Sequence, residues 1–408
     1  MLFEPYYEIV HPLCPVLPDS GLPTANAIFD NASQNFGKAL IIALRLIPQK
    51  RDTPSDDDQA WLEKFVNDET RQPLSSRSTE DSLLLLWTCL IMFVVVQHNT
   101  EIWTKPTLPE CDLLSMSITI CDRHFQDKPF LAEVNQYDAE WTRSAQITTM
   151  LSRLYAISKG ESNDPMPSHL APYINTNTDT LPPRVTFMAL MSDTLQASLS
   201  LLPHNGVSAI AGTSIDFSRF MSANIRANLN LVGMTWDDPI ARQVKAFSDL
   251  ISMRANTMRF PKPTAVGPVL NLAEAIRMST VTEAEDSSGA YIYNPLALHT
   301  NTLTTMTLLE LQQCDWDDPT TGALIDQAVE DMRKCLVNLQ ERMRATACDP
   351  TKGRFWAGVL LELVEERRNA ANPNLISNGR GEVLIVDLAA LLQRGYANAL
   401  LDYACKKR

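Results

Sequence analysis

The longest apolar run in the chain is the feature that most constrains its fold. The run extends from Leu83 to Val96, 14 consecutive residues that are apolar except for Thr88. A helix that crosses a bilayer needs about 20 such residues, so we expect this run to lie outside any membrane. A helix that is apolar all round must be covered on all sides by other elements. The run therefore predicts a central helix inside a protein body.

Most of the remaining chain has the spacing of amphipathic helices. From Leu324 to Met343 the apolar residues recur every three or four positions, and the charged residues fall elsewhere. The same spacing recurs at Phe36, Leu40, Ala43, Leu44 and Ile47, at Ile240, Val244, Phe247 and Ile251, and at Trp356, Val359, Leu360, Leu363 and Val364. Apart from a β-like Val-Leu-Ile-Val run at 383–386, no stretch alternates convincingly as a strand. The sequence predicts an all-α fold in which each of these helices buries one face.

Long polar breaks separate the predicted helices, at residues 49–59, 160–183, 279–293 and 369–381. The second break is rich in Pro, Asn and Thr, a composition that buries too little apolar surface to offset its ordering entropy. A last helix is expected from about Val383 to Tyr403. We predict a multi-helix array with long polar connections, whose two halves, 1–185 and 186–408, pack as one continuous body.

A four-residue repeat precedes two of these helices. Trp-Asp-Asp-Pro occurs at 236–239 and again at 316–319. Asp238 and Asp318 fit the N-cap position, and the prolines that follow them fit the first helical turn. An acidic metal site is the alternative, and capping is the prediction we favour.

Charge and cysteine usage argue against several classes of function. The formal net charge is −13, and we find no strong basic patch, so direct binding of nucleic acid by this chain is not expected. The eight cysteines include no Cys-x-x-Cys pair, a pattern typical of buried reduced thiols in a cytosolic or nuclear protein. We therefore predict no metal site.

Enzyme motifs are also missing from the sequence. It contains no zinc-protease helix motif, no nucleophile elbow and no phosphate-binding loop. We predict no catalytic residue and no cofactor. The remaining enzymatic alternative is an all-α, magnesium-dependent isoprenoid synthase, with Asp56–Asp58 or Asp315, Asp317 and Asp318 as its carboxylates. The first cluster is expected in a loop and the second in a helix cap, whereas such carboxylates must converge on a cavity.

Three segments resemble a known family. An aromatic pair, a Val-His-Pro turn and a second proline occur between Tyr6 and Leu17. The stretches from Leu113 to Asp127 and from Glu140 to Gly160 follow in the same order. This arrangement resembles the middle homology region of fungal zinc binuclear cluster transcription factors. The family pattern matches at Tyr7, His11, Pro12, Pro15 and Arg153, which we expect to have structural roles.

The resemblance implies a helical regulatory domain that controls transcription in the nucleus. It implies a small apolar effector, a coactivator or repressor as protein partner, and a homodimer. The six-cysteine DNA-reading cluster of the family does not occur, so we expect a regulatory region separated from its DNA-binding module. Should a pocket exist, its candidate lining is Trp103, Trp141, Met150, Met188 and Met191, for which ordinary core packing is the alternative. A scaffold that binds another regulator is the second hypothesis.

Overall fold

The structure is a computed structural model of the whole chain. It describes residues 4–19, 23–47, 54–73, 76–98, 110–126, 137–159, 161, 165–167, 170, 181–200, 213–257, 266–286, 292–314, 316–346, 356–371 and 400.

The predicted all-α class is confirmed. Of the described residues, 82% are helical and none lies in a strand. The helices are α1 (Glu4–Ile9), α2 (Pro23–Asn31), α3 (Gln34–Arg45), α4 (Asp56–Thr70), α5 (Thr79–His98), α7 (Glu110–Gln126), α8 (Asp138–Lys159), α10 (Pro183–Ser200), α11 (Thr213–Val232), α12 (Pro239–Thr257), α13 (Val266–Asp286), α14 (Ala297–Leu311), α15 (Pro319–Thr346) and α16 (Trp356–Ala371).

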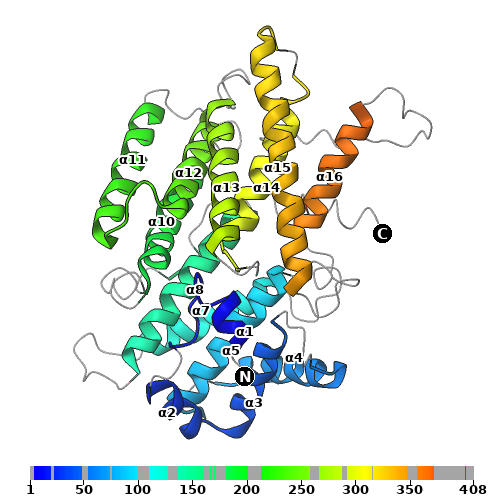
Figure 1. The fold of residues 1–408 in the computed structure, drawn as a ribbon. Helices are drawn as coiled ribbons and strands as arrows, with labels where there is room; N and C mark the ends of the chain where they lie inside the picture. The colour runs from blue at the N-terminus through cyan, green and yellow to red at the C-terminus, as the bar shows by residue number, and fades with distance from the viewer. Residues whose placement is uncertain are drawn as a thin grey trace.

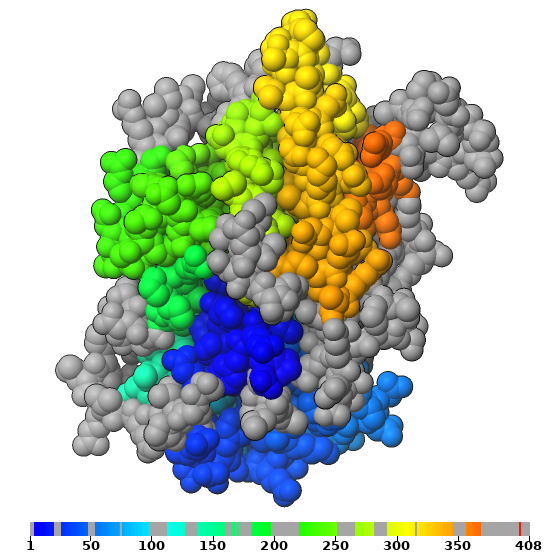
Figure 2. Space-filling model, in the orientation of Figure 1, coloured from blue at the N-terminus to red at the C-terminus, as the bar shows by residue number. Residues whose placement is uncertain are grey.

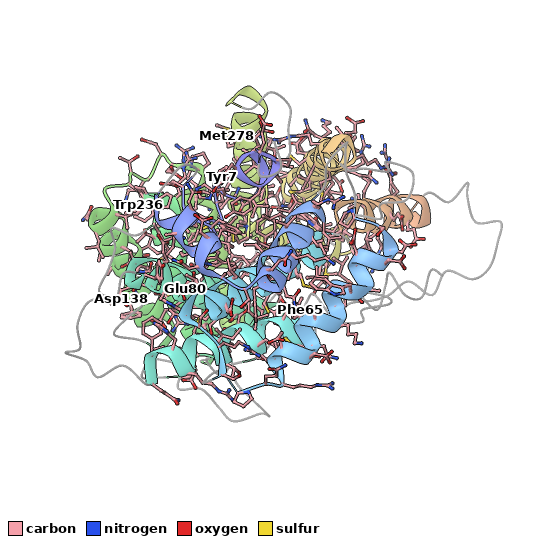
Figure 3. The ribbon with its side chains drawn as sticks, turned by 90° about the horizontal axis from the view of Figure 1, so that it is seen from below. Tyr7, Phe65, Glu80, Asp138, Trp236 and Met278 are labelled. Atoms are coloured by element: carbon pink, nitrogen blue, oxygen red, sulfur yellow. The ribbon has the colours of Figure 1, made fainter. Side chains whose placement is uncertain are left out.

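The helices form an array in which most pack on the next helix in the chain (Figure 1). In the lower part α3 contacts α5, α5 contacts α7, and α7 contacts α8. Helix α8 then packs on α10, from which contacts continue through α12 and α13 to α15 and α16. Figure 3 views the lower part from below, with Phe65 of α4 at one side and Asp138 of α8 at the other. The expected boundary at residue 185 falls in the first turn of α10.

The apolar run forms the central helix α5, as predicted. Every side chain from Leu83 to Val96 is buried, with at most 6% of its surface exposed. Among the described residues α5 is the one helix long and apolar enough to cross a membrane, and 89% of that stretch lies inside the fold. A buried core helix has the same length and composition as a membrane span, so this finding fits the position of α5 between α3, α7 and α8.

The amphipathic stripes are confirmed on α3, α12 and α16, because the residues of each stripe that have described side chains are buried. On α15 the prediction is wrong at Leu324, which is 52% exposed, whereas Ile325, Met332 and Leu336 are buried. Leu324 belongs to the start of α15, and the first turns of this helix extend past the neighbouring helices at the top of Figure 1.

Helices extend into the predicted polar breaks, chiefly into the first and the third. Helix α4 begins at Asp56, because the Ser55 hydroxyl accepts a hydrogen bond from the backbone N–H of Asp58 at 3.1 Å. Aspartates in a first turn also favour the helix dipole. Helix α13, which packs between α12 and α15, continues to Asp286. The predicted last helix lies outside the described residues, except for Leu400, which is helical and buried.

The capping prediction for the Trp-Asp-Asp-Pro repeat is confirmed. Asp238 Oδ1 accepts a hydrogen bond from the N–H of Ile240 at 2.9 Å, and α12 begins at Pro239. Asp318 Oδ1 accepts from the N–H of Thr320 at 3.0 Å, and α15 begins at Pro319.

Candidate functional site

Helix α1 and the chain reversal at residues 10–19 that follows it form one unit, residues 4–19, which we name the N-terminal turn and which the family-motif side chains hold together. The Tyr7 hydroxyl donates a hydrogen bond to the backbone carbonyl of Pro18 at 2.8 Å. His11 Nε2 lies 2.9 Å from Asp19 Oδ1. Burial lowers the pKa of His11, against the raising effect of Asp19. These two contacts therefore hold the reversal of the chain in place.

Tyr6 closes this N-terminal turn from the inside. Its hydroxyl accepts a hydrogen bond from the N–H of Leu17 at 2.8 Å, and burial raises its pKa well above the ordinary value. Pro12 and Pro15 lie between these anchor points, where their fixed backbone angles keep the chain out of a regular helix. The structural role expected for the N-terminal motif residues agrees with these contacts.

The start of α8 packs against the N-terminal turn and brings a buried charge pair to it. Arg143 forms an ion pair with Glu140, and both side chains are less than 10% exposed. Burial lowers the pKa of Arg143, although Glu140 and the facing Tyr6 oppose this shift. Burial raises the pKa of Glu140. Two segments that carry the family resemblance, far apart in the sequence, thus meet in one place.

The N-terminal segment also joins the two halves of the protein. The backbone N–H of Tyr293, just before α14, donates a hydrogen bond to the Ile9 carbonyl at 2.6 Å. The hydroxyl of the same tyrosine donates to Gln97 Oε1 of α5 at 2.9 Å. Figure 2 shows this segment in dark blue at the middle of one face, between the lower and upper helices. A change in the N-terminal turn would therefore reach both halves.

Arg153 links the same halves further along α8. Its Nη2 lies 3.0 Å from Asp193 Oδ1 of α10, and the arginine side chain is 7% exposed. The pair fixes α10 on α8, which agrees with the structural role expected for Arg153.

The residues predicted to line a pocket lie in the packed interior. Trp141 stacks on His124, with ring centroids 3.7 Å apart and planes 7° from parallel. Met150, Met188 and Met191 are at most 2% exposed. Trp103 lies outside the described residues. These positions correspond to ordinary core packing, the alternative considered above, and none of them lines the surface cavity described next.

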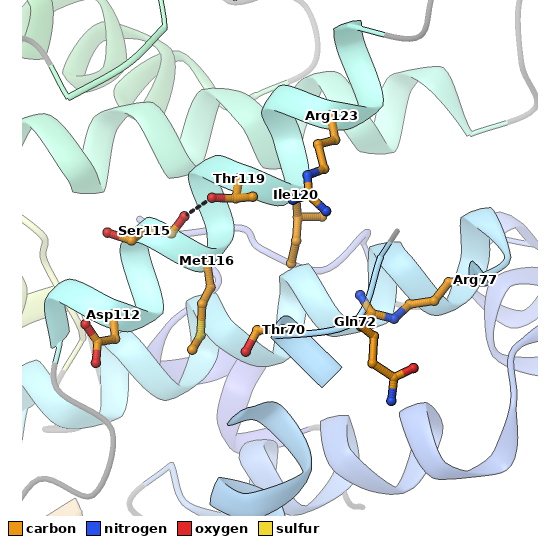
Figure 4. Close-up of a pocket in the computed structure, with 9 residues that line it drawn as sticks. All are labelled: Thr70, Gln72, Arg77, Asp112, Ser115, Met116, Thr119, Ile120 and Arg123. Carbon is orange, nitrogen blue, oxygen red and sulfur yellow. Dashed lines mark hydrogen bonds between the residues drawn. The ribbon is translucent and has the colours of Figure 1, made fainter. Parts of the chain in front are cut away.

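A surface cavity of about 270 Å³, which we name the α7 hollow, lies between α7 and the segment that follows α4 (Figure 4). Its walls are Thr70, Gln72, Arg77, Asp112, Ser115, Met116, Thr119, Ile120 and Arg123. The α7 residues among them are three or four positions apart, so they form a single face of that helix.

Arg77 is the most unusual group in the α7 hollow. Its side chain is 5% exposed, and its Nε donates to Glu69 Oε2 at 3.0 Å. Its Nη2 is enclosed and has no hydrogen-bond partner in the described part of the chain. Gln72 Nε2 lies 3.4 Å from the other oxygen of the same glutamate. The sequence analysis missed this site, because a single arginine in a polar connection carries no signal of burial.

The buried thiols are held in their neutral form. Burial raises the pKa of Cys89 and Cys121 to about 12 and raises that of Cys14 further. The described cysteines are free, as expected for reduced thiols. Within the described ranges no group of three or more His, Cys, Asp or Glu side chains could hold a metal ion.

The aspartate clusters considered for magnesium lie far apart. Asp56–Asp58 form the first turn of α4 at the bottom of Figure 1, whereas Asp317 and Asp318 directly precede α15, which begins at the top. Asp315 lies outside the described residues. Asp318 Oδ2 already accepts a hydrogen bond from the Thr321 hydroxyl at 2.9 Å. Each cluster supports the start of its own helix, and the two do not share a cavity.

Helix α14 is a feature that the sequence patterns did not indicate. Thirteen of its fifteen residues are buried, including His299, Asn301 and five threonines. Burial lowers the pKa of His299 to about 3, so this imidazole is neutral in the folded protein at physiological pH. The hydroxyls of Thr302, Thr304 and Thr305 have no partner among the described residues. A polar helix thus crosses the apolar interior of the second half.

The comparisons with known proteins give no indication of function, so the proposals below are argued from the geometry. No protein-family model, no curated protein and no solved structure matches this chain.

Proposed function

We propose that this chain is a regulatory domain of the fungal transcription-factor type, which controls transcription by binding an effector or a protein partner. The proposal includes the location and the assembly expected from the resemblance, in the nucleus and as a homodimer. The chain itself would not bind DNA, since its net charge is −13.

The observation that carries the proposal is the construction of the N-terminal turn. The segment that resembles the family holds its shape through Tyr7 and His11, rests on the Arg143 pair of α8, and is bonded to Tyr293 before α14. An element that contacts both halves can carry a signal from one to the other, because packed side chains and hydrogen bonds couple the parts that they join. The contacts of the N-terminal turn with both halves support the proposal.

A reporter experiment tests this function. The full chain is inserted between a heterologous DNA-binding domain and an activation domain, and reporter transcription is measured in yeast nuclei. We expect the inserted chain to reduce transcription several-fold relative to a fusion with an inert helical protein of similar length. Equal transcription from the two fusions would contradict the proposal.

A matched pair of variants shows whether the N-terminal turn matters. Tyr7→Phe removes the hydrogen bond to Pro18 and keeps the ring, so it should release part of the repression. Tyr155→Phe, on the half-buried part of α8, is the control and should leave repression unchanged. Fusion levels are checked by immunoblot, so that a loss of protein is not mistaken for release.

One further observation supports a protein partner. Phe220 and Leu231 on α11 are 58% and 59% exposed, and eleven residues, about three helical turns, separate them. They therefore lie on one face of α11. A partner that docks there, as in the scaffold hypothesis, would be lost in a Phe220→Ser, Leu231→Ser double variant, whereas repression by the folded body alone would persist.

A further inference from the structure

We propose that the α7 hollow binds a small organic acid, with the carboxylate of the ligand at Arg77 and Arg123 and its apolar body along α7. The inference deepens the proposed function, and it rests on that proposal for the role of the acid as the effector. The binding site itself stands on the geometry of the α7 hollow.

The first argument is the incomplete bonding of Arg77. A guanidinium has five N–H donors in a fixed fork, and a carboxylate accepts two of them side by side. Glu69 takes the Nε donor, and Nη2 is left enclosed without a partner among the described residues. A buried charged donor without an acceptor is unfavourable, so an incoming carboxylate would complete a bonding pattern that the protein leaves unfinished.

The second argument is the charge at the arginine end. Arg123 is exposed on the last turn of α7 and lines the same hollow as Arg77, from the opposite wall (Figure 4). Glu69 balances one of these two cations. The end of the hollow thus keeps one positive charge in excess, which a monoanionic ligand would neutralise.

The acidic residue of the hollow is too distant to cancel this charge. Asp112 is eleven residues before Arg123 on α7, which places it about 16 Å away along the helix axis. That separation exceeds the Debye length of about 8 Å at physiological ionic strength. Figure 4 shows Asp112 and Arg123 at opposite ends of the α7 hollow.

The middle of the hollow selects for an apolar body. Met116 and Ile120, one helical turn apart, lie between the two charged ends, with the Ser115 and Thr119 hydroxyls beside them. The Thr119 hydroxyl donates a hydrogen bond to the Ser115 carbonyl at 2.8 Å. The volume of about 270 Å³ is close to the lower end of the range for small-molecule pockets, so the ligand is small.

The probe that tests this inference is hexanoate, compared with 1-hexanol and hexylammonium, which have the same chain length and a different head group. Binding to the full chain is measured by ligand-observed NMR titration at low ionic strength. We expect hexanoate to bind at least about 10-fold more tightly than hexanol, since the charge-assisted bonds to arginine are lost in the alcohol. Equal affinity for the two, or tighter binding of hexylammonium or inorganic phosphate, would overturn the proposal.

Three arginine variants locate the binding. Arg77→Gln should weaken hexanoate binding at least about 10-fold, and Arg123→Gln should weaken it several-fold. Arg123 is exposed, so its variant should fold even if loss of the Arg77–Glu69 pair disturbs the first one. Arg71→Gln is the matched control, because it removes an exposed arginine at the end of α4 that does not line the hollow. Binding that is equal in wild type and Arg123→Gln would show that hexanoate binds elsewhere and would overturn the assignment.

The two proposals fail separately. If hexanoate binds at the arginines but the two fusions give equal reporter transcription, the binding site is supported and its regulatory role is contradicted. A reporter that responds to insertion of the chain, together with no hexanoate binding, would overturn the inference and leave the proposed function in place.

Discussion

Two helices of this protein, α5 and α14, are both almost completely buried and have opposite compositions. Helix α5 is apolar from Leu83 to Val96, whereas α14 contains a histidine, an asparagine and five threonines among its buried residues. The first helix gains free energy from transferring its side chains out of water. The second must satisfy its polar groups locally, as Thr300 and Thr307 do by donating to backbone carbonyls four residues earlier. Complete burial therefore does not imply an apolar sequence.

The largest expected effect is on the apolar helix. Trp87→Ala removes a fully buried side chain of α5, and its indole N–H donates to the Ser144 hydroxyl of α8 at 2.9 Å. We expect the free energy of unfolding to fall by about 3–5 kcal/mol, because truncation leaves a cavity in a packed interior. Chemical denaturation followed by circular dichroism measures this change in the free energy of unfolding. Trp61→Ala, at a half-buried tryptophan of α4, is the control and should cost clearly less.

The next effect is a pH dependence of the free energy of unfolding, which α14 should cause through His299. The pKa of His299 is lowered to about 3 by burial, whereas that of an unfolded histidine is about 6.5. As the pH falls below 6.5, the unfolded chain binds a proton that the folded chain excludes. The free energy of unfolding should therefore fall by about 1.4 kcal/mol per pH unit from this group, a loss confined to the window between the two pKa values.

His299→Leu tests this assignment, because leucine does not titrate. The variant should lose less stability than the wild type between pH 6.5 and pH 5, by about 2 kcal/mol in the difference of the two curves. Parallel curves for the two proteins would show that His299 is not buried in its neutral form.

The smallest effect compares two threonines of α14. Thr302→Val replaces a hydroxyl that has no partner among the described residues by a methyl group of similar size. Stability should stay unchanged or rise by up to about 1 kcal/mol, because no hydrogen bond is lost. Thr307→Val removes a hydroxyl that donates to the Leu303 carbonyl at 2.6 Å, and it should cost about 0.5–1.5 kcal/mol. Thermal unfolding of the two variants side by side gives the sign of each change.

The same contrast explains what could be predicted from the sequence. Helix α5 and the stripes of α12 and α16 follow from apolar spacing, because the pattern itself records which face is buried. Helix α14 gives no such signal. Threonine has a low helix propensity, and because it is polar, a pattern of apolar residues does not mark it as buried. Its helical form depends on α13, α15 and α16, which pack around it.

The candidate sites divide in the same way. The prolines and the aromatic pair of the N-terminal turn indicate an irregular segment before a helical body, as the structure has it. The contact of that turn with Arg143 and with Tyr293 joins residues far apart in the sequence, and one sequence contains no record of such pairs. The α7 hollow was missed for a similar reason, because Arg77 and the α7 residues that line the cavity with it come together only in the folded chain.

The central claim, on which both proposals depend, is that α5 and α14 belong to one continuous helical core. Hydrogen exchange followed by mass spectrometry tests it most directly, because amides in a core exchange only through large openings of the fold. We predict that peptides from α5 and α14 exchange equally slowly and more slowly than peptides from α4 and α11. Fast exchange of α14 beside a protected α5 would contradict the claim.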